Sequence, residues 1–485
     1  MTDESSPAPG ELSARRAESE GKRRARRLFG FGVLGVSLLL AYYALTARVE
    51  DPIHLYQGLL MIVFSTLPSL LWARRGQTQL PVFEIFLLTT ANTYALPLLN
   101  DRADLRAYPP EIITQCGFMV LLFQVVAICT YGGIRGQPGR SRFFTEEILT
   151  DKLQKYIGYG LIISTIYTYF NVFHEELIPA DINSVLRAIF SGLAMIVTFI
   201  QARRWGLGQL TRGERGAFVF LLSLQILMQF STLFLVNGIS AILLALVGYV
   251  AGSRRVPLAV TATLLVFIAL LHNGKSVMRS KYWDDTGEHR QVEMTGLVPF
   301  FSEWISHGLT VNNREGGDQQ ITKNLIDRSS LFQILCLVAY YTPEQQPFLY
   351  GDTYLDIPGQ FIPRFFWEGK PVAHISTYKM AIYYGLQTEE DTLKTTIGFG
   401  LIAEAYANFG FFGIGALAFA LGAFYKLIAA RTVHSPLLSY PGFFLVILLA
   451  WSFQTEWPLS LWLSSMWQST AAMLGLPFIL RNFFN

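Results

Sequence analysis

The sequence predicts an all-α polytopic membrane protein with about twelve transmembrane helices and one large non-cytoplasmic loop that contains short interfacial helices. Composition is the first observation: 52% of the 485 residues are hydrophobic and 15% are charged, against roughly 25% charged in an average soluble domain. The second is the recurrence of apolar segments of about 20 residues, the length that crosses a bilayer core. The third is the alternation of basic and acidic connections, which is typical of loops on opposite sides of a membrane.

The N-terminal part of the chain is read as a tail followed by nine spans. Residues 1–27 are polar and end in a basic cluster, which predicts a disordered cytoplasmic tail. Residues 28–272 then hold the first nine spans. Seven of them are expected at 28–47, 54–72, 81–99, 111–131, 153–173, 182–201 and 256–272. The stretch 216–253 is about twice one span long, and Asn237-Gly238 near its middle predicts a tight hairpin between two helices.

The C-terminal residues 398–485 supply three more spans, at 399–425, 438–455 and 459–480. Flanking charges support this arrangement, because cytoplasmic loops collect Lys and Arg. Basic residues mark one side of the predicted membrane, for example Arg74-Arg75, Arg203-Arg204, Arg254-Arg255 and Arg481. Acidic residues such as Glu50-Asp51, Glu175-Glu176 and Glu456 mark the other side. Both termini are therefore predicted to be cytoplasmic.

Composition also excludes several classes of function. The net charge of +3 is too small and too dispersed for a nucleic-acid-binding protein. The three cysteines, Cys116, Cys129 and Cys336, suggest apolar fillers and not a disulfide framework or a thiolate metal site. The sequence contains no zinc-binding spacing, phosphate-binding loop or nucleophile-elbow motif. We therefore expect a metal-independent chemistry without a cofactor.

Residues 273–397 form the large loop, which is polar and lies on the non-cytoplasmic side of the predicted topology. Long loops are largely exempt from the positive-inside rule, so its basic residues do not alter the orientation. Two apolar stretches, 298–309 and 330–341, are too short to span and predict interfacial or re-entrant helices. A loop of this length with many aromatic residues is expected to be functional.

The first candidate site lies in the segment 350–371. Pro363 and Pro371 stiffen the backbone, which would hold Arg364 and Lys370 near the membrane surface with Trp367 as an interfacial anchor. Arg presents a planar fork of donors suited to phosphate, and Lys presents a compact charge. The alternative is a rigid surface loop whose cations meet lipid headgroups.

The second candidate is the pair Glu404 and Asn408, four residues apart and therefore on one helix face at the outer end of the tenth span. A carboxylate at a membrane boundary is costly unless it is paired or hydrated. Glu404 is predicted either to act as a general base, to orient a cation, or to be the structural partner of an Arg in the loop.

Further candidates have a structural alternative beside each functional one. Arg328 precedes an apolar stretch and would face the membrane surface, or Asp327 or Ser329 would simply cap a helix there. Arg279 and Lys281 follow the ninth span and would extend a basic rim, or would snorkel to headgroups. His374 would shuttle a proton, or face solvent as a lone loop histidine usually does.

Taken together, these elements resemble the Wzy-type oligosaccharide repeat-unit polymerases. The resemblance consists of Gly351-Asp352-Thr353-Tyr354, of Ile362-Pro363-Arg364 with Trp367 and Lys370-Pro371, and of Glu404 with Asn408-Phe409-Gly410. It covers roughly residues 325–425, and the N-terminal half is similar in its hydropathy pattern. The chain departs from the family at Asn237-Gly238-Ile239-Ser240, which lacks an expected Arg. A positive charge there is absent or supplied from elsewhere.

The resemblance implies transfer of a glycan chain from undecaprenyl pyrophosphate to a lipid-linked repeat unit, at the periplasmic face of the bacterial inner membrane. It implies catalytic roles for Arg364, Arg328 and Glu404, in which the cations stabilise the leaving pyrophosphate and the carboxylate assists the acceptor hydroxyl or orders an Arg. The residues implied in substrate binding are Lys370, Arg279, Lys281, Trp367, Tyr354, Asn408 and His374. The implied partners are the lipid-linked glycans, the bilayer, a chain-length regulator and a flippase, and no nucleic acid.

Two other functions remain open at this point. A glycan ligase of the O-antigen type shares the membrane layout and the lipid pyrophosphate donor, but transfers one finished block. A lipid-linked-glycan transporter would show paired halves and substrate sites at the bilayer midplane, whereas here the charges crowd one outer loop. The product distinguishes them, because a polymerase makes a ladder of repeats.

Overall fold

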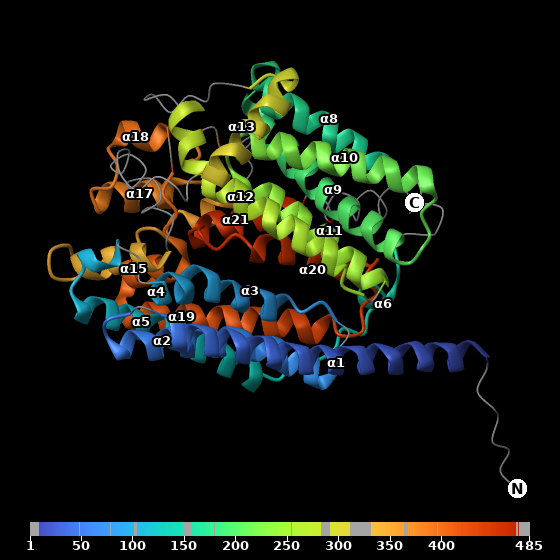
Figure 1. The fold of residues 1–485 in the computed structure, drawn as a ribbon, viewed down its shortest axis with the longest axis horizontal. Coiled ribbons are helices and arrows are strands. Elements are labelled where there is room, and N and C mark those ends of the chain that lie inside the picture. The colour runs from blue at the N-terminus through green and yellow to red at the C-terminus, as the bar shows by residue number, and fades with distance from the viewer. Residues whose placement is uncertain are drawn as a thin grey trace, which may run out of the picture.

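The computed structural model describes residues 9–47, 49–77, 79–100, 104–148, 157–178, 180–253, 255–282, 292–310, 331–362, 367, 369–394, 396–471 and 474. In those ranges all regular secondary structure is helical (Figure 1). Seven described helices are long and apolar enough to cross a membrane: Arg26–Thr46, Pro52–Arg75, Val82–Leu99, Pro110–Gly133, Val185–Gly206, Leu258–Lys275 and Gly400–Arg431. The all-α prediction is confirmed, and the composition of these helices indicates a membrane-embedded protein.

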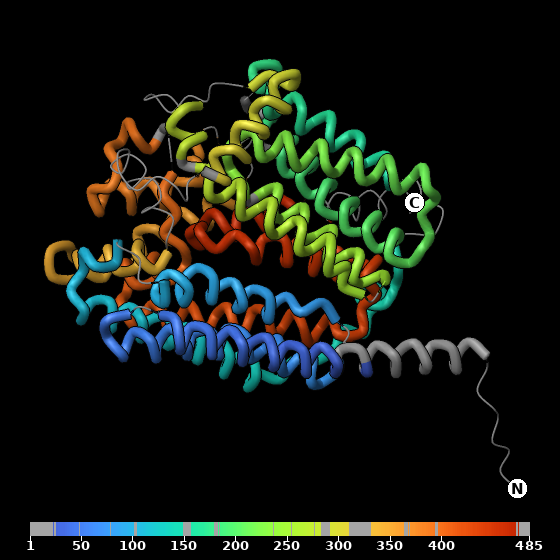
Figure 2. Tube along the Cα trace, in the orientation of Figure 1, coloured from blue at the N-terminus to red at the C-terminus, as the bar shows by residue number. Residues whose placement is uncertain are grey.

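The helices form two groups, and the first is the lower layer in Figure 1. It brings the N-terminal helices together with a C-terminal one, as the blue and orange tubes of Figure 2 show, and α19 packs closely along α5. Its members are α1 (Pro9–Thr46), α2 (Pro52–Arg75), α3 (Val82–Thr90), the π-helical turn η1 (Ala91–Ala95), α4 (Leu96–Leu99), α5 (Pro110–Gly133) and α19 (Gly400–Arg431).

The second group is the upper layer, and two further helices join it to the first. It contains α8 (Tyr159–Phe173), α9 (Ala180–Gly206), α10 (Arg212–Ser231), α11 (Leu235–Ser253), α12 (Leu258–Tyr282) and α13 (Leu297–Thr310). The helices α20 (Tyr440–Ser452) and α21 (Leu459–Thr470) contact α9 on one side and α3 and α19 on the other. The C-terminal pair therefore holds the layers together.

Short helices occupy the connections. These are η2 (Leu105–Ala107), α6 (Arg142–Thr145), η3 (Glu175–Leu177), η4 (Met294–Gly296), α15 (Leu331–Tyr341), α16 (Ile357–Gln360), α17 (Ile375–Tyr383) and α18 (Glu389–Lys394). In Figure 1, α15, α17 and α18 lie at one end of the molecule and α6 lies at the opposite end. The boundaries follow ordinary capping chemistry. Asp51 Oδ1 accepts from the Ile53 N–H at 2.8 Å at the start of α2, and Gly76 ends that helix with φ 65°.

Among the boundaries that differ from the sequence predictions are those of α1 and α11. Helix α1 begins at Pro9, within the segment expected to be a disordered tail; the Ala, Glu, Arg and Lys residues there are good helix formers. The hairpin expected at Asn237-Gly238 is wrong, because α10 ends at Ser231 and α11 begins at Leu235. Gly238 lies in the first turn of α11, where a Cβ would come within 2.3 Å of the Phe230 ring. This glycine therefore allows two helices to approach and does not form the turn between them.

The two apolar stretches of the large loop are helical, as expected. Helix α13 packs along α12, and α15 packs against α5 and α19. Most side chains of α15 are buried, including Phe332, Leu335 and Val338. It is therefore enclosed by protein and does not lie with one face on a membrane surface.

Helix α19 is interrupted in its N-terminal third. Phe409 (φ −141°, ψ 18°) and Gly410 (φ 60°, ψ −145°) leave the helical conformation. Residues 411–431 after the break would be about 32 Å long at 1.5 Å per residue, which matches a bilayer core of about 30 Å. The segment 400–408 before the break is almost wholly buried and carries Glu404 and Asn408.

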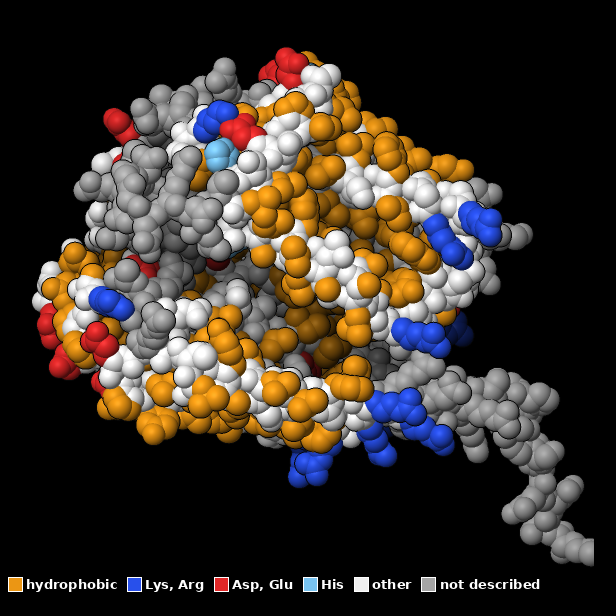
Figure 3. Space-filling view, in the orientation of Figure 1, with side chains coloured by type: hydrophobic (Ala, Val, Ile, Leu, Met, Phe, Trp, Pro, Cys, Tyr) orange, Lys and Arg blue, Asp and Glu red, His pale blue; other side chains and the backbone are white. Residues whose placement is uncertain are grey.

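Charged and apolar side chains are distributed unevenly over the face in Figure 3. Lys and Arg gather at the end where α1 enters, and acidic and basic side chains mix at the opposite end. The same face is hollowed between α3 and the α11–α12 pair, with hydrophobic side chains along the walls of the hollow. On α12 itself, Leu265 and Val266 are exposed.

Candidate functional site

The site is built at the end of the molecule that carries the large loop, and Asn408 is its central connector. The Asn408 amide is fully buried. Its Nδ2 donates to Thr353 Oγ1 and to the Glu404 carbonyl, both at 2.8 Å, and its Oδ1 accepts from the Gly351 N–H at 2.9 Å. The backbone adds two bonds, from Leu349 N to Ala407 O and from Tyr350 N to Asn408 O. The segment 349–354 is therefore fastened to the N-terminal part of α19.

Glu404 fastens a third segment to the same place. Its carboxylate is fully buried, and Oε2 accepts from the Leu459 N–H at 2.6 Å. Leu459 is the first residue of α21, so the carboxylate lies at the positive end of that helix. The Thr353 side chain lies beside the same carboxylate. In this geometry Glu404 acts as an anchor between α19, α21 and the 349–354 segment.

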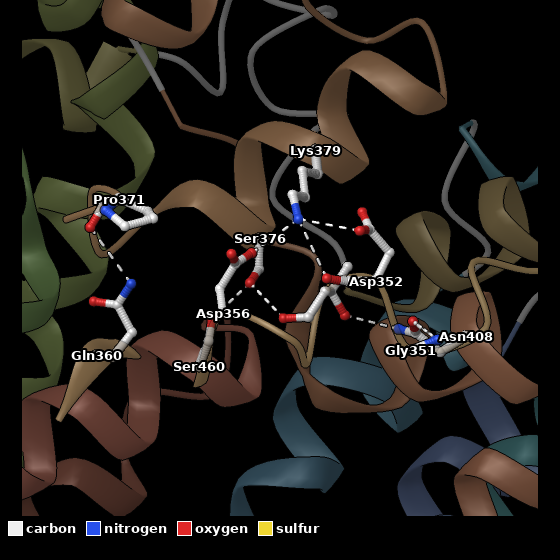
Figure 4. A network of polar contacts seen from close by, with 10 residues as sticks. Gly351, Asp352, Asp356, Gln360, Pro371, Ser376, Lys379, Asn408 and Ser460 are labelled. Carbon is white, nitrogen blue, oxygen red and sulfur yellow. Dashed lines mark hydrogen bonds and ion pairs between the residues drawn. The ribbon is translucent and has the colours of Figure 1, made fainter. Parts of the chain in front are cut away.

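Ser376 extends the network to α17, as Figure 4 shows. Its hydroxyl donates to Thr353 O at 2.8 Å and lies 2.8 Å from the Ser460 hydroxyl of α21. Lys379, one turn further on, points between two carboxylates, with Nζ 3.2 Å from Asp352 Oδ1 and 2.9 Å from Asp356 Oδ2. These serine and ion-pair contacts join residues far apart in the sequence, and no sequence pattern pointed to them.

Lys370 is used to hold its own loop together. The side chain is only 8% exposed, and its ammonium donates to the carbonyls of Gln360 and Ile362, both at 2.8 Å. This bond pattern satisfies a buried charge with backbone acceptors. Trp367 is 42% exposed and packs against Gly359, where a Cβ would lie 3.0 Å from the ring. Arg364 and Arg328 lie outside the described residues.

The Tyr354 side chain is half-buried, and its ring lies 6.4 Å from that of Phe409 at the break in α19. Burial, reinforced by the Glu404 charge, raises the pKa of the Tyr354 phenol above its ordinary value. The phenol therefore stays protonated at neutral pH and remains a hydrogen-bond donor. His374 is also half-buried. Burial, followed by repulsion from Arg187 on α9, lowers the pKa of its imidazole.

A cation pair on α12 is the most suggestive feature of the site. Lys275 and Arg279 are one turn apart on the same helix, and both are half-buried. Burial lowers the pKa of Arg279 to about 10, and the nearby Glu456 opposes this effect. Glu456 also interacts electrostatically with Lys275. Both cations are therefore desolvated and close to one carboxylate in the α20–α21 connection.

Arg279 also supplies a charge at the turn between α10 and α11. Its Nη2 donates to Leu233 O at 3.1 Å, and its guanidinium carbon lies 5.3 Å from the centre of the Phe234 ring. The resemblance to Wzy-type polymerases implied a positive charge near Asn237, where the sequence itself has none. Arg279 places a guanidinium beside this turn, against Phe234, and Phe234 lies three residues before Asn237.

Lys281, the other predicted rim cation, lies in a separate exposed cluster. Its Nζ is 2.5 Å from Glu303 Oε1 on α13, and Tyr282 OH donates to Glu303 Oε2 at 3.1 Å. These contacts lower the pKa of Glu303, and the hydrogen bond from the Lys281 ammonium is the largest cause. Lys281 thus ties α12 to α13.

Arg279 was a candidate site residue from the sequence, whereas Lys275 and Glu456 were not. The signal for Lys275 was its spacing of four from Arg279, which places both on one helix face. Glu456 carried no such signal, because only the packing of α20 and α21 brings it to α12. Among the described residues, no group of three or more His, Cys, Asp or Glu side chains is arranged to hold a metal ion.

The fold and this site define the class: a membrane-embedded protein, helical throughout its described regular structure, with a half-buried cation pair near the C-terminal end of α12. The chain belongs to the family described as Domain of unknown function (DUF8712), which matches residues 140–440. The matched region contains Lys275, Arg279, Glu404 and Asn408 and ends before Glu456. No curated protein matches the chain, and no solved structure matches it.

Proposed function

We propose that this protein is a membrane glycosyltransferase that polymerises undecaprenyl-pyrophosphate-linked oligosaccharide repeat units at the periplasmic face of the bacterial inner membrane. The observation that carries the proposal is the pair of half-buried cations Lys275 and Arg279, one turn apart on α12, a helix that also carries the exposed apolar side chains Leu265 and Val266. A lipid pyrophosphate has an anionic head and an apolar tail, so it needs cations next to an apolar surface. Lys and Arg are the residues that bind phosphate in proteins.

In this proposal twelve spans cross the membrane, both termini are cytoplasmic, and the large loop is periplasmic. The gathering of Lys and Arg at the end where α1 enters supports the orientation. The break in α19 supports the proposed position of the protein in the bilayer. The part of the helix after the break is about as long as a bilayer core is thick.

The chemistry proposed for the site is charge stabilisation with positioning. Lys275 and Arg279 stabilise the negative charge that develops on the leaving pyrophosphate. Tyr354, protonated at neutral pH, donates a hydrogen bond to a substrate oxygen. Glu404 and Asn408 act as positioning residues, since their buried contacts hold the 349–354 segment and α21 in place. Arg328 and Arg364 retain their predicted roles in binding pyrophosphate, and Lys370 is assigned to loop structure by its two carbonyl contacts.

The test is glycan length in cells whose own copy of the gene is deleted. Arg279→Ala and Lys275→Ala are expected to reduce turnover about a hundredfold or more, as for other electrostatic stabilisers. The expected product is single repeat units in place of a ladder. Arg279→Lys should restore part of the activity, because it keeps the charge but loses the planar fork. Arg255→Ala, an arginine at the opposite end of α12, is the matched control.

The outcomes separate the alternatives. A normal ladder from the Lys275→Ala/Arg279→Ala double variant at normal protein level would exclude this site. One undivided block transferred to another acceptor would identify a ligase, and loss of all outward sugar would identify a transporter. Purified protein with defined lipid-linked repeat units, with and without a chelator, tests the reaction directly.

A further inference from the structure

A second recess lies at the outer end of the first helix group, away from the cation pair. It is a groove of about 490 Å³ between the N-terminal ends of α2 and α5 and residue Phe411 of α19. Its lining includes Asp51, Glu111, Thr114, Gln115, Phe118 and Phe411. In the sequence, Asp51 served only as a marker of one side of the membrane and the other lining residues carried no functional signal; the proposed reaction uses none of them.

The lining combines two exposed rings with oxygen acceptors. Phe118 is 55% exposed and Phe411 is 44% exposed. The break at Gly410 displaces Phe411 from the register of the preceding helix. Glu111 contributes an exposed carboxylate, and Asp51 contributes a second whose Oδ1 already accepts from the Ile53 N–H. Aromatic faces attract C–H groups of positive character, and ionised carboxylates only accept hydrogen bonds. A sugar ring offers both, because it has apolar C–H faces and a rim of hydroxyl donors.

The wall of the groove is already fixed by close packing. His54 Nε2 lies 3.0 Å from Thr114 Oγ1, and Gln57 Nε2 donates to the Thr114 carbonyl at 2.9 Å. Gly117 approaches Gln57 so closely that a Cβ would lie 2.1 Å from its amide oxygen. A recess held in this way loses little entropy when it binds a ligand.

Charge selects among the ligands available at an outer membrane surface. The two carboxylates repel phospholipid phosphate and lipid pyrophosphate, and they accept hydrogen bonds from a neutral ligand that is rich in hydroxyl groups. The cations suited to pyrophosphate lie on α12, in the other helix group. We propose that this groove is a second ligand site, which binds a neutral sugar unit of the glycan away from the pyrophosphate; this inference rests on the proposed function.

The groove is also linked to the candidate site by a hydrogen bond. Gln115, on its wall, donates from Nε2 to Tyr406 OH at 3.1 Å. Tyr406 lies between Glu404 and Asn408 in the segment 400–408, which anchors the 349–354 loop. The hydrogen bond thus joins the groove wall on α5 to the same short helical segment that holds the 349–354 loop and the start of α21.

The test measures sugar binding and does not require catalysis. The purified full-length protein in phosphatidylglycerol nanodiscs is titrated with neutral di- and trisaccharides of glucose, galactose, N-acetylglucosamine and rhamnose, and saturation-transfer NMR reports contact. Wild type is expected to bind at least one of them at millimolar concentration. Phe118→Ala and Glu111→Gln should each weaken that binding about tenfold. The matched control is Phe412→Ala, which removes a neighbouring ring that is 79% exposed and outside the groove lining.

Each result decides the inference. Selective loss of binding in Phe118→Ala and Glu111→Gln, with Phe412→Ala unchanged, supports it. Binding that these variants do not alter overturns it, and so does the absence of saturation transfer to every sugar. If the variants instead lose contact with phosphatidylethanolamine added to the nanodiscs, the groove binds a lipid amine and the inference is wrong. Sugar binding in the groove together with a normal glycan ladder from the Lys275/Arg279 double variant would preserve this site and reject the assignment of the cation pair.

Discussion

Replacing Asn408 by alanine should release the 349–354 segment from α19. The substitution removes three hydrogen bonds of 2.8, 2.8 and 2.9 Å from a fully buried amide. It leaves the Gly351 N–H without its acceptor and takes a donor from the Thr353 hydroxyl. A buried polar group that loses its partner costs about 1–3 kcal/mol, so the expected loss of stability is about 2–4 kcal/mol.

Two measurements check this value and its location. Thermal unfolding of the purified protein in detergent reports the loss of stability, and limited proteolysis followed by mass spectrometry reports cleavage within 349–356. Asn183→Ala is the matched control, because Asn183 is also buried and hydrogen-bonded, to Tyr167 and Glu175 in the second helix group. It should lower stability without exposing 349–356. Unchanged proteolysis of that segment in Asn408→Ala would refute the role of Asn408 as its anchor.

Three further substitutions test other parts of the structure. Gly410→Ala forces a side chain into φ 60°, ψ −145°, with its Cβ 3.1 Å from Phe348, and should cost about 1–3 kcal/mol in thermal unfolding. Gly415→Ala, with open space around the new Cβ, should be neutral or stabilising by about 0.5–1 kcal/mol. Lys370→Met should speed proteolysis of residues 357–372 because two buried carbonyls lose their donor, whereas loss of the more exposed Lys379 should have less effect. His374→Gln should flatten the fall in melting temperature between about pH 7 and 5.

The direction of the pH effect expected for His374→Gln follows from the lowered pKa of His374. Burial and the Arg187 charge place it below the ordinary value of 6.5, so the unfolded chain binds the proton more tightly. The stability contributed by the neutral imidazole is present above about pH 6.5 and is lost as the pH falls below it. An equally steep acid decline in wild type and His374→Gln would show that other groups cause it. Equal melting temperatures for Gly410→Ala and Gly415→Ala would likewise show that the break in α19 is not imposed by Gly410.

The sequence located most helices because their signal is local. A run of about 20 apolar residues has one way to satisfy its backbone in lipid, which is a helix. The stretch 216–253 shows the limit of this reasoning. Its length predicted two helices, yet Asn237-Gly238 suggested the wrong turn, because Gly238 serves the contact with Phe230 and not the hairpin.

The candidate site depended on tertiary structure to a much greater degree. Glu404 and Asn408 were recognised from their spacing, but the burial that turns them into anchors came from α21 and the 349–354 segment. Lys370 was recognised as a cation, and only the fold of its loop directed its ammonium to two carbonyls. Glu456 and the groove at Phe411 carried no sequence signal, since their neighbours come from distant parts of the chain.

The sequence by itself determined that this chain is helical and suited to a membrane, because hydropathy and helix formation depend on residues within one or two turns of each other. Tertiary structure decided which cations are desolvated, which carboxylate approaches Lys275 and Arg279, and where the surface is recessed. Those properties depend on the solvent that packing excludes, and packing brings together residues more than 170 positions apart, as with Glu456 and the α12 cations.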